Sequence, residues 1–494
     1  MTEAERGSPL PDPSGWGTHV LTVAAAPDGS VWVGTYGEGI YVSRDGRGDV
    51  WERLTRDAQG RISWDFVNAL AFGPGEVWYG TVGNGWGVSR DGGRTWRNWT
   101  FEELGPRWLY VAPDGIRAVG DTVYVATADG LRITADDGAT WREVTEKNHL
   151  PSKYLLGLDI EPLEDGPPIV RLSHLRGVSE SSDGGRGWRH ARAMAAGRDA
   201  AFAADPPGRI ADPGHPLVRR ILEWQGAFRD YPDPGGEIAA VGGRAHFWFR
   251  RPISPDDNPY LDQTYLYCST MGGNFQQHQG VEFNDPEGTA VRAIGAGVVA
   301  FAGPAEAGSN TVAILHDRTL DGRRVWSTYY HNADLAVAEG KRMEAGRLIA
   351  HVGSTGRATN DHLHLEIHVT PDDDPSAVVD PERRYPPYTV NPELWLEPIP
   401  RTGAIAGRVE DAAGRLVPGA RVYGVVKPLP RETPFSFAES YRDRARADAV
   451  FGENFAIGDV TPGDHVLGVE IDGERVYRKV RVEAGKVTEV TLRP

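Results

Sequence analysis

Apolar and polar residues alternate over many short stretches of this 494-residue chain. Alternation with a period of two is typical of half-buried β-strands, whereas the apolar spacing of 3.6 residues that marks amphipathic helices is hard to find. The chain also contains 61 glycines and 36 prolines, which end strands and form turns. The pattern predicts a mainly β protein of several domains, with one helical candidate at residues 218–228.

The first half of the chain repeats one pattern of short apolar runs followed by Ser/Thr-x-Asp and a tryptophan. Equivalent points, at intervals of 46, 45 and 47 residues, are Asp45, Asp91, Asp136 and Asp183. A repeat of this length with several strands in each copy is typical of β-propeller blades. We expect residues 1–195 to form about four propeller-type blades, and residues 196–243 to form a linker or a degenerate blade.

The second copy gives the motif in full, with Ser89, Asp91, Gly93, Thr95 and Trp96. It resembles the Asp-box hairpin of sialidase-like, or BNR-repeat, propellers. Aspartate can accept backbone N–H bonds inside a turn, glycine supplies a positive φ, and tryptophan packs into the interior. We therefore interpret the aspartates as structural, and the propeller as a binding module for a glycan or protein ligand. A propeller glycosidase ranks lower, because the Arg-Ile-Pro signature of that family is absent.

Residues 402–494 alternate apolar and polar positions through about seven short runs. Turn residues separate the runs, for example Gly419-Ala420 and Pro462-Gly463. This segment resembles the carboxypeptidase-regulatory-like, or prealbumin-like, β-sandwiches. The resemblance implies a small sandwich that serves as a spacer, an attachment module or a protein contact.

Charge and composition exclude several classes of function. The net charge of -16 argues against a nucleic-acid binder, which needs a basic surface. The single cysteine, Cys268, excludes an internal disulfide and a cysteine-based zinc site. No apolar run approaches 18 residues, so we expect no membrane span, and no signal peptide is visible in this chain.

Histidine is concentrated in the second half, where seven of the 14 histidines fall between His278 and His368. In the stretch NDHLHLEIHV, residues 360–369, the polar residues share one strand face and the aliphatic residues share the other. The polar face carries His362, His364, Glu366 and His368. Such a face offers several ligands to a metal ion.

Upstream, His278 and Glu282 are four residues apart, so on an extended strand they share a face, which Gly280 leaves open. A hydrolytic zinc site needs three protein ligands and one position for water. The metal lowers the pKa of that water, while a second imidazole moves the proton and a further donor stabilises the oxyanion. His278, Glu282 and one histidine of the His-Leu-His sequence are the candidate ligands.

These elements resemble the lysostaphin/LytM-type zinc endopeptidases, which cut peptidoglycan cross-bridges or stem peptides. The family pattern runs His-x-Gly-x-Asp, Gly-Thr-x-Val, Tyr-x-His, Gly-x-Thr-Gly and His-Leu-His. The corresponding elements here are His278 to Glu282, Gly288 to Val291, Tyr329 to His331, Gly353 to Gly356 and His362 to His364. We therefore expect an antiparallel-β peptidase domain of this type over residues 244–395.

The resemblance implies one Zn²⁺ per chain, bound by His278, Glu282 and His364, with His362 as general base and His331 as a donor to the transition state. The second ligand is usually aspartate, and Glu282 has one methylene more. We expect His316, His351 and His368 to be structural or to lie behind the ligands, and Glu366 to orient an imidazole.

The implied substrate is a peptidoglycan peptide or another Gly/Ala-rich peptide, and the implied location is extracellular or in the cell envelope. The alternative is a non-catalytic LytM-like adaptor that binds wall fragments or a partner hydrolase. Such regulators usually lack several ligands, whereas this chain keeps all of these positions with one conservative exchange.

Overall fold

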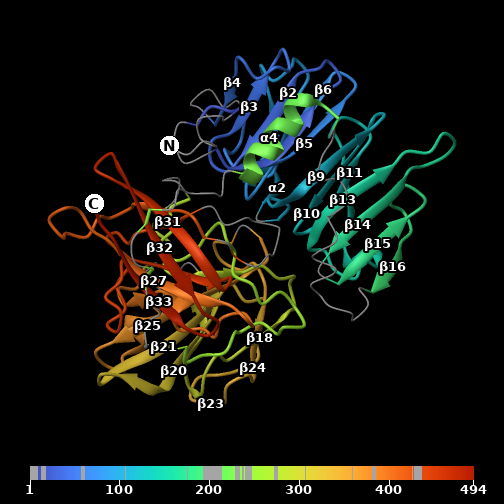
Figure 1. Cartoon of the computed structure of the whole chain (residues 1–494). Helices are drawn as coiled ribbons and strands as arrows, with labels where there is room; N and C mark the ends of the chain where they lie inside the picture. The colour runs from blue at the N-terminus through green and yellow to red at the C-terminus, as the bar shows by residue number, and fades with distance from the viewer. Residues whose placement is uncertain are drawn as a thin grey trace. The chain divides into compact units, whose positions relative to one another are not determined.

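The structure is a computed structural model that describes residues 9–12, 18–56, 62–105, 107–174, 176–192, 214–227, 234–235, 238–239, 247–271, 276–305, 308–358, 360–380, 385–425, 427 and 437–494. The chain divides into two compact units, Met1–Asp230 and Tyr231–Pro494. Both consist mainly of β-strands, as the alternating pattern predicts (Figure 1).

The first unit contains four antiparallel sheets, each of four strands that follow one another in chain order. The first sheet contains β1 (Val20–Ala25), β2 (Val31–Thr35), β3 (Ile40–Ser43) and β4 (Glu52–Leu54), and the second contains β5 (Val67–Gly73), β6 (Glu76–Thr81), β7 (Trp86–Ser89) and β8 (Arg97–Trp99). The third contains β9 (Val111–Val119), β10 (Thr122–Thr127), β11 (Gly130–Thr134) and β12 (Arg142–Val144), and the fourth contains β13 (Leu155–Glu161), β14 (Ile169–His174), β15 (Gly177–Ser181) and β16 (Arg189–Arg192). Short helical turns, α2 (Phe101–Leu104) and η1 (Glu146–Asn148), follow β8 and β12.

The first strands of successive sheets contact one another, β1 with β5, β5 with β9, and β9 with β13. Each sheet therefore corresponds to one sequence repeat. Over the described residues no sheet closes on itself and no closed ring of sheets is formed, so a complete propeller remains a prediction.

The repeated aspartates lie in the turn that follows the third strand of each sheet. A hydroxyl donates to the Asp carboxylate at 2.7–2.8 Å in every copy, from Ser43, Ser89, Thr134 and Ser181. In the second copy, Asp91 also accepts from the backbone N–H of Thr95 at 2.9 Å, and Gly93 has a φ of 89°. These contacts are the structural role that the sequence predicts for the aspartates.

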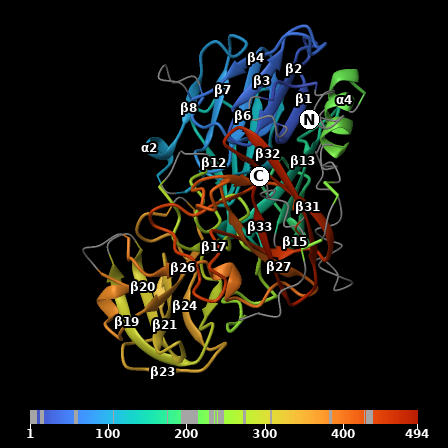
Figure 2. The ribbon, with the colours of Figure 1, turned by 60° about the vertical axis from the view of Figure 1, so that its left-hand side comes forward.

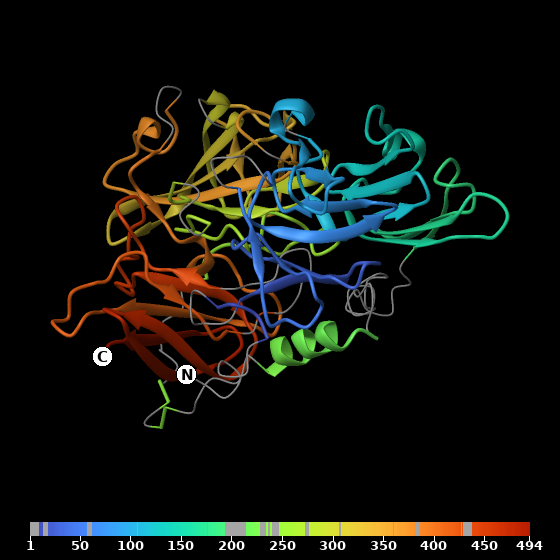
Figure 3. The ribbon, with the colours of Figure 1, turned by 90° about the horizontal axis from the view of Figure 1, so that it is seen from above.

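The helical candidate forms α4 (Pro216–Ala227), which contributes Leu217, Val218, Ile221 and Trp224 to one hydrophobic cluster with strands of the first sheet (Figure 3). Of the segment 196–243, the structure describes residues 214–227, 234–235 and 238–239. In the described ranges no helix combines the length and apolar character needed to cross a membrane.

The second unit is built around a seven-stranded antiparallel sheet with the order β17-β25-β21-β20-β19-β23, in which β26 also pairs with β25 (Figure 2). Its strands are β17 (Val281–Phe283), β19 (Gly297–Ala305), β20 (Ser309–Leu320), β21 (Arg323–Tyr330), β23 (Arg342–Met343), β25 (Leu363–Thr370) and β26 (Thr389–Val390). A smaller sheet contains β18 (Ala290–Arg292), β24 (Leu348–His351) and β22 (Asp334–Leu335), and the 3₁₀ turns η2 (Pro375–Ala377) and η3 (Pro392–Leu394) lie after β25 and β26.

Seven strands are described in residues 402–494, in agreement with the number of alternating runs. They are β27 (Gly403–Val409), β28 (Arg421–Val422), β29 (Ala438–Glu439), β30 (Phe455–Val460), β31 (Gly463–Ile471), β32 (Glu474–Val482) and β33 (Val487–Leu492). The strands form three small sheets, and β27 pairs with β33 in parallel.

The segment expected to form the peptidase domain, residues 244–395, shares one hydrophobic cluster with the C-terminal strands. Trp395 and Leu363 lie in the same buried group as Ala404, Tyr441 and Val487. The two segments that the sequence assigns to separate domains therefore belong to one compact unit.

Candidate metal centre

The site is built on the polar face of β25. Leu363, Leu365 and Ile367 are fully buried in the core, so the alternating residues of the strand face the opposite side. Glu282 on β17 is the direct cross-strand partner of His364 on β25. Antiparallel pairing thus brings together two residues that are 82 positions apart in the sequence.

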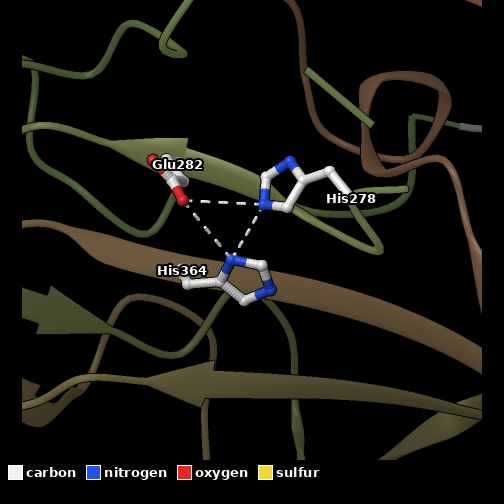
Figure 4. A group of neighbouring side chains, drawn as sticks. All are labelled: His278, Glu282 and His364. Atoms are coloured by element: carbon white, nitrogen blue, oxygen red, sulfur yellow. Dashed lines mark hydrogen bonds and ion pairs between the residues drawn. The ribbon is translucent and has the colours of Figure 1, made fainter. Parts of the chain in front are cut away.

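His278 completes a group of three with Glu282 and His364 (Figure 4). Nε2 of His278 lies 3.0 Å from Nδ1 of His364 and 3.6 Å from Oε1 of Glu282, and Nδ1 of His364 lies 3.8 Å from that oxygen. A circle through three points at these separations has a radius of about 2.0 Å, which matches Zn–N and Zn–O bonds of about 2.0–2.2 Å. In the part of the chain that the structure describes, this is the only group of three such residues with ligand atoms this close.

The hydrogen bonds of the two imidazoles leave the correct nitrogens free for a metal. Nδ1 of His278 lies 3.2 Å from the carbonyl oxygen of Leu266, and Nε2 of His364 lies 3.3 Å from Oε1 of Glu366. Both oxygens only accept, so these two nitrogens carry the hydrogens. The remaining nitrogens then face each other with lone pairs, an arrangement that a cation between them satisfies.

The electrostatics of the metal-free site agree with this arrangement. Burial and the nearby His364 lower the pKa of His278 to about 4. Burial also acts to lower the pKa of His364, but hydrogen bonds to Glu282 and Glu366 and their charges raise it to about 9. Burial acts to raise the pKa of Glu282, but His362, His364 and His278 hold it well below its ordinary value. Without metal the cluster therefore holds a proton on His364.

Gly280 is required by the close approach of β25. A Cβ at this position would lie 2.5 Å from the carbonyl oxygen of Leu365 and 2.7 Å from Nε2 of His364. A side chain between His278 and Glu282 would therefore displace the third ligand. The open face that the sequence predicts at Gly280 is occupied by the His364 ring.

His362 and His331 lie beside the three ligands, with their ring centroids 4.8 Å apart. Nδ1 of His362 donates to the carbonyl of Asn360 at 2.9 Å, which leaves Nε2, 3.5 Å from Oε1 of Glu282, as an acceptor. His362 is therefore equipped to take up a proton.

His331 is held by two contacts and has a φ of 66°, in the left-handed region. Its backbone N–H donates to the carbonyl of Gly308 at 3.0 Å, and Nδ1 donates to the carbonyl of Thr355 at 2.9 Å. Burial, followed by the nearby His362 and His364, lowers the pKa of His331 well below its ordinary value. The neutral ring consequently presents Nε2 as an acceptor, so a donor role requires that His331 first gain a proton.

Glu366 connects the ligand His364 to groups deeper in the fold. Its Oε2 lies 3.0 Å from Nε2 of the fully buried His368 and accepts from the hydroxyl of Tyr330 at 3.2 Å. The sequence places Glu366 as an orienter of an imidazole, and its contacts with His364 and His368 are of that kind.

A cavity of about 370 Å³ adjoins the cluster, lined by residues that include Tyr265, Gln277, Gln279, Arg357 and Tyr385. The Tyr265 ring stacks on the His278 ring with centroids 3.8 Å apart and an angle of 12° between the planes. No motif in the sequence points to these five residues. They belong to no recognisable spacing pattern, and only the fold brings them to the site.

The other two histidines expected to be structural lie in separate contacts. His316 is buried between the carbonyl of Ala296 and the hydroxyl of Ser327. His351 pairs with Asp334 at 2.7 Å on the smaller sheet.

Residues 276–378 match the protein family described as peptidase family M23. The chain is 37% identical over 92 residues to the DD-carboxypeptidase/endopeptidase Mpg of Neisseria meningitidis, a match that covers 19% of this chain and 20% of that protein. It is 34% identical over 139 residues to the peptidoglycan DD-endopeptidase ShyC of Vibrio cholerae, covering 28% of this chain and 29% of that protein. These alignments span less than a third of the length of either relative.

Two further matches involve staphylococcal enzymes. The glycyl-glycine endopeptidase ALE-1 of Staphylococcus capitis is 38% identical over 98 residues, covering 19% of this chain and 26% of that protein. The catalytic domain of the antimicrobial peptidase lysostaphin from Staphylococcus simulans is 30% identical, with 24% of this chain and 84% of that domain covered and a TM-score of 0.20. Residues 276–378, which carry the four clustered histidines and Glu282 described above, are a domain of the peptidase family M23 type.

Proposed function

We propose that this chain is a zinc-dependent endopeptidase that hydrolyses peptide bonds in bacterial cell-wall peptidoglycan. The observation that carries the proposal is the convergence of His278, Glu282 and His364, whose ligand atoms are 3.0–3.8 Å apart. Hydrogen bonds on the other nitrogen of each imidazole orient the two histidines. The relative described as a peptidoglycan DD-endopeptidase supports the choice of substrate. The cell envelope is the location at which such a substrate is found.

Each residue has a chemical role in this proposal. When bound, zinc would supply Lewis-acid activation of water and of the scissile carbonyl. His362 would take the proton of the attacking water at Nε2, because its Nδ1 is committed to Asn360. His331 would stabilise the transition state once its Nε2 carries a proton, and Glu366 would hold His364 in orientation.

The lining of the cavity favours a polar peptide. Gln276 offers an amide group, and Arg357 adds a cation at the cavity wall. Carboxylates on a substrate are recognised by arginine. A stem peptide with a free carboxylate is therefore favoured over a bridge of glycines alone.

The other parts of the chain are proposed to bind or scaffold. The four repeat sheets of residues 1–195 would form a propeller-type module for a glycan or protein ligand, with residues 196–243 as a linker or a degenerate blade. Residues 402–494 would form a prealbumin-like sandwich beside the peptidase domain of residues 244–395.

The proposal is tested by metal content and cleavage of purified peptidoglycan. We expect about one zinc per chain, loss of cleavage on chelation and recovery on addition of zinc. His364→Ala should lose both metal and cleavage, whereas His362→Ala should keep the metal and lose at least about 100-fold in cleavage rate, because a general base contributes about 10²–10⁴-fold.

His351→Ala is the matched control, because His351 pairs with Asp334 on the smaller sheet, and it should keep zinc and activity. Zinc-loaded protein that binds peptidoglycan and releases no peptide would contradict the enzyme and identify the adaptor instead.

A further inference from the structure

A buried polar contact joins the C-terminal strands to the segment that carries His278. We call residues 437–446, which include β29, the clasp segment. It contacts the residues immediately before and after His278.

Gln277, immediately before His278, is 6% exposed. Its Oε1 accepts from the backbone N–H groups of Arg444 at 3.0 Å and Ala445 at 2.8 Å. Its Nε2 lies 3.1 Å from the sulfur of Cys268, whose own N–H donates to the carbonyl of His278 at 2.8 Å. The clasp segment thus fixes the residue that precedes the first ligand.

Gln279, immediately after His278, is 4% exposed. Its Nε2 donates to the carbonyl of Pro386 at 2.8 Å, and lies 3.3 Å from Oγ1 of Thr389 and 3.5 Å from the carbonyl of Arg444. Because residues alternate along an extended segment, Gln277 and Gln279 point away from the side of His278. The imidazole is therefore aimed by the fixing of its two neighbours.

The backbone hydrogen-bond partner of His278 is held by the same segment. The carbonyl of Ser269 accepts from the N–H of His278 at 3.1 Å. The next residue, Thr270, donates from its hydroxyl to the carboxylate of Glu439 at 2.8 Å, and both side chains are at most 6% exposed. Hydrogen bonds of buried groups are directional and costly to break, so they fix a position more closely than apolar packing does.

Arg444 also reaches the cavity wall. Its guanidinium carbon lies 3.9 Å from the centroid of Tyr385, which lines the cavity next to the metal cluster. A guanidinium over an aromatic face holds the ring in place.

We propose that the clasp segment positions residues of the peptidase site. It positions His278 against Glu282 and His364 through Gln277 and Gln279, and through Arg444 it fixes Tyr385 as a wall of the substrate cavity. The second effect rests on the proposed function, whereas the first is measured by metal binding alone. Gln277 and Arg444 are positioning residues in this scheme.

The test uses the full chain with zinc or cobalt as the probe. Gln277→Met keeps the volume and removes the acceptor, and we expect about a tenfold or greater loss of zinc affinity, in the range found for partners behind metal ligands. The cobalt-substituted protein should show altered visible absorption bands, which report ligand geometry. Gln277→Glu keeps an oxygen for the two N–H groups. It should recover most of the zinc affinity and most of the native cobalt absorption.

Thr270→Val provides a second variant if Gln277→Met does not fold. It removes the hydroxyl bond to Glu439 at nearly constant volume and should weaken zinc binding in the same direction. Folded variants with unchanged zinc affinity and unchanged cobalt absorption would overturn the positioning of His278.

Arg444→Met keeps both backbone donors and removes the cation over Tyr385. We expect KM for a wall peptide to rise about three- to tenfold, with kcat and zinc affinity unchanged. An unchanged KM would overturn the role in the cavity wall. If the native chain binds zinc and cleaves nothing, the proposed function fails, while the metal measurements still decide whether the clasp segment positions His278.

Discussion

His278 and His364 approach each other more closely than two neutral imidazoles with facing lone pairs would allow. Their facing nitrogens are 3.0 Å apart, and the other nitrogen of each ring is bound to an oxygen. One proton satisfies this geometry in the metal-free protein. Burial acts to lower the pKa of His364, but hydrogen bonds to Glu282 and Glu366 and their charges raise it to about 9. A metal ion must displace that proton when it binds.

Zinc affinity is therefore expected to fall as the pH decreases from 8 to 6. His364 is protonated below its metal-free pKa of about 9, so one proton leaves for each ion bound and the affinity changes about tenfold per pH unit. Competition with a chelator of known affinity at each pH measures the slope. Glu366→Gln should make the slope shallower near pH 8, because it removes one carboxylate that raises this pKa. A flat profile for the native chain would contradict the proton displacement.

The five clustered residues can be predicted from the sequence because each stands at a recognisable spacing, from His278 to His364. The protonation of His331 could not be predicted, because it depends on the carbonyl of Thr355, which only the fold brings to Nδ1. Tyr265 is a further case, since its stacking on His278 leaves no mark in the sequence.

Along the strand β25, the alternation of aliphatic and polar residues determines which side chains face the site. The aliphatic residues of the strand lie in the core. On its polar face, His364 pairs with Glu282 of β17 on one side and with Tyr330 of β21 on the other. The alternation predicts both faces of the strand. The identity of the neighbouring strands does not follow from it, because pairing between distant strands depends on the whole sheet.

Gly280→Ala tests the close approach between β17 and β25. The added methyl group would overlap the carbonyl of Leu365 and the ring of His364, so we expect a loss of stability of about 1–3 kcal/mol and a marked loss of zinc affinity. Thermal unfolding with and without chelator measures both.

Gly303→Ala is the matched control on the same sheet, since its Cβ would have no neighbour closer than 3.7 Å. It should leave zinc binding unchanged. Equal zinc affinity of the Gly280→Ala variant and the native chain would contradict the steric role of Gly280.

At the scale of the whole molecule, two compact units have separate hydrophobic clusters. The repeat pattern predicts the four sheets of the first unit, because each copy carries its own strands and turn. It could not predict that residues 402–494 share a core with the peptidase segment, since an alternating strand shows that one face is buried and leaves its partner undefined.

Ser89→Ala should lower the stability of the first unit alone. The fully buried hydroxyl accepts from the N–H of Gly93 at 2.7 Å, and its loss leaves a buried donor unpaired, at about 1–3 kcal/mol. Calorimetry should show one unfolding transition moving to lower temperature, while the transition that responds to chelator stays in place. Ser89→Thr keeps the hydroxyl, as Thr134 does in the third copy, and should behave as the native chain. A shift of both transitions would contradict the independence of the two units.

The parallel pairing of β27 with β33 has a consequence for biosynthesis. Val487 to Leu492 pair with Ala404 to Val409, so the first strand of the C-terminal segment remains without this neighbour until residue 492 has left the ribosome. If the clasp segment positions His278 as proposed, a nascent chain that already contains every zinc ligand would still hold its ion weakly. Translation order would then delay tight zinc binding until the clasp segment has been made.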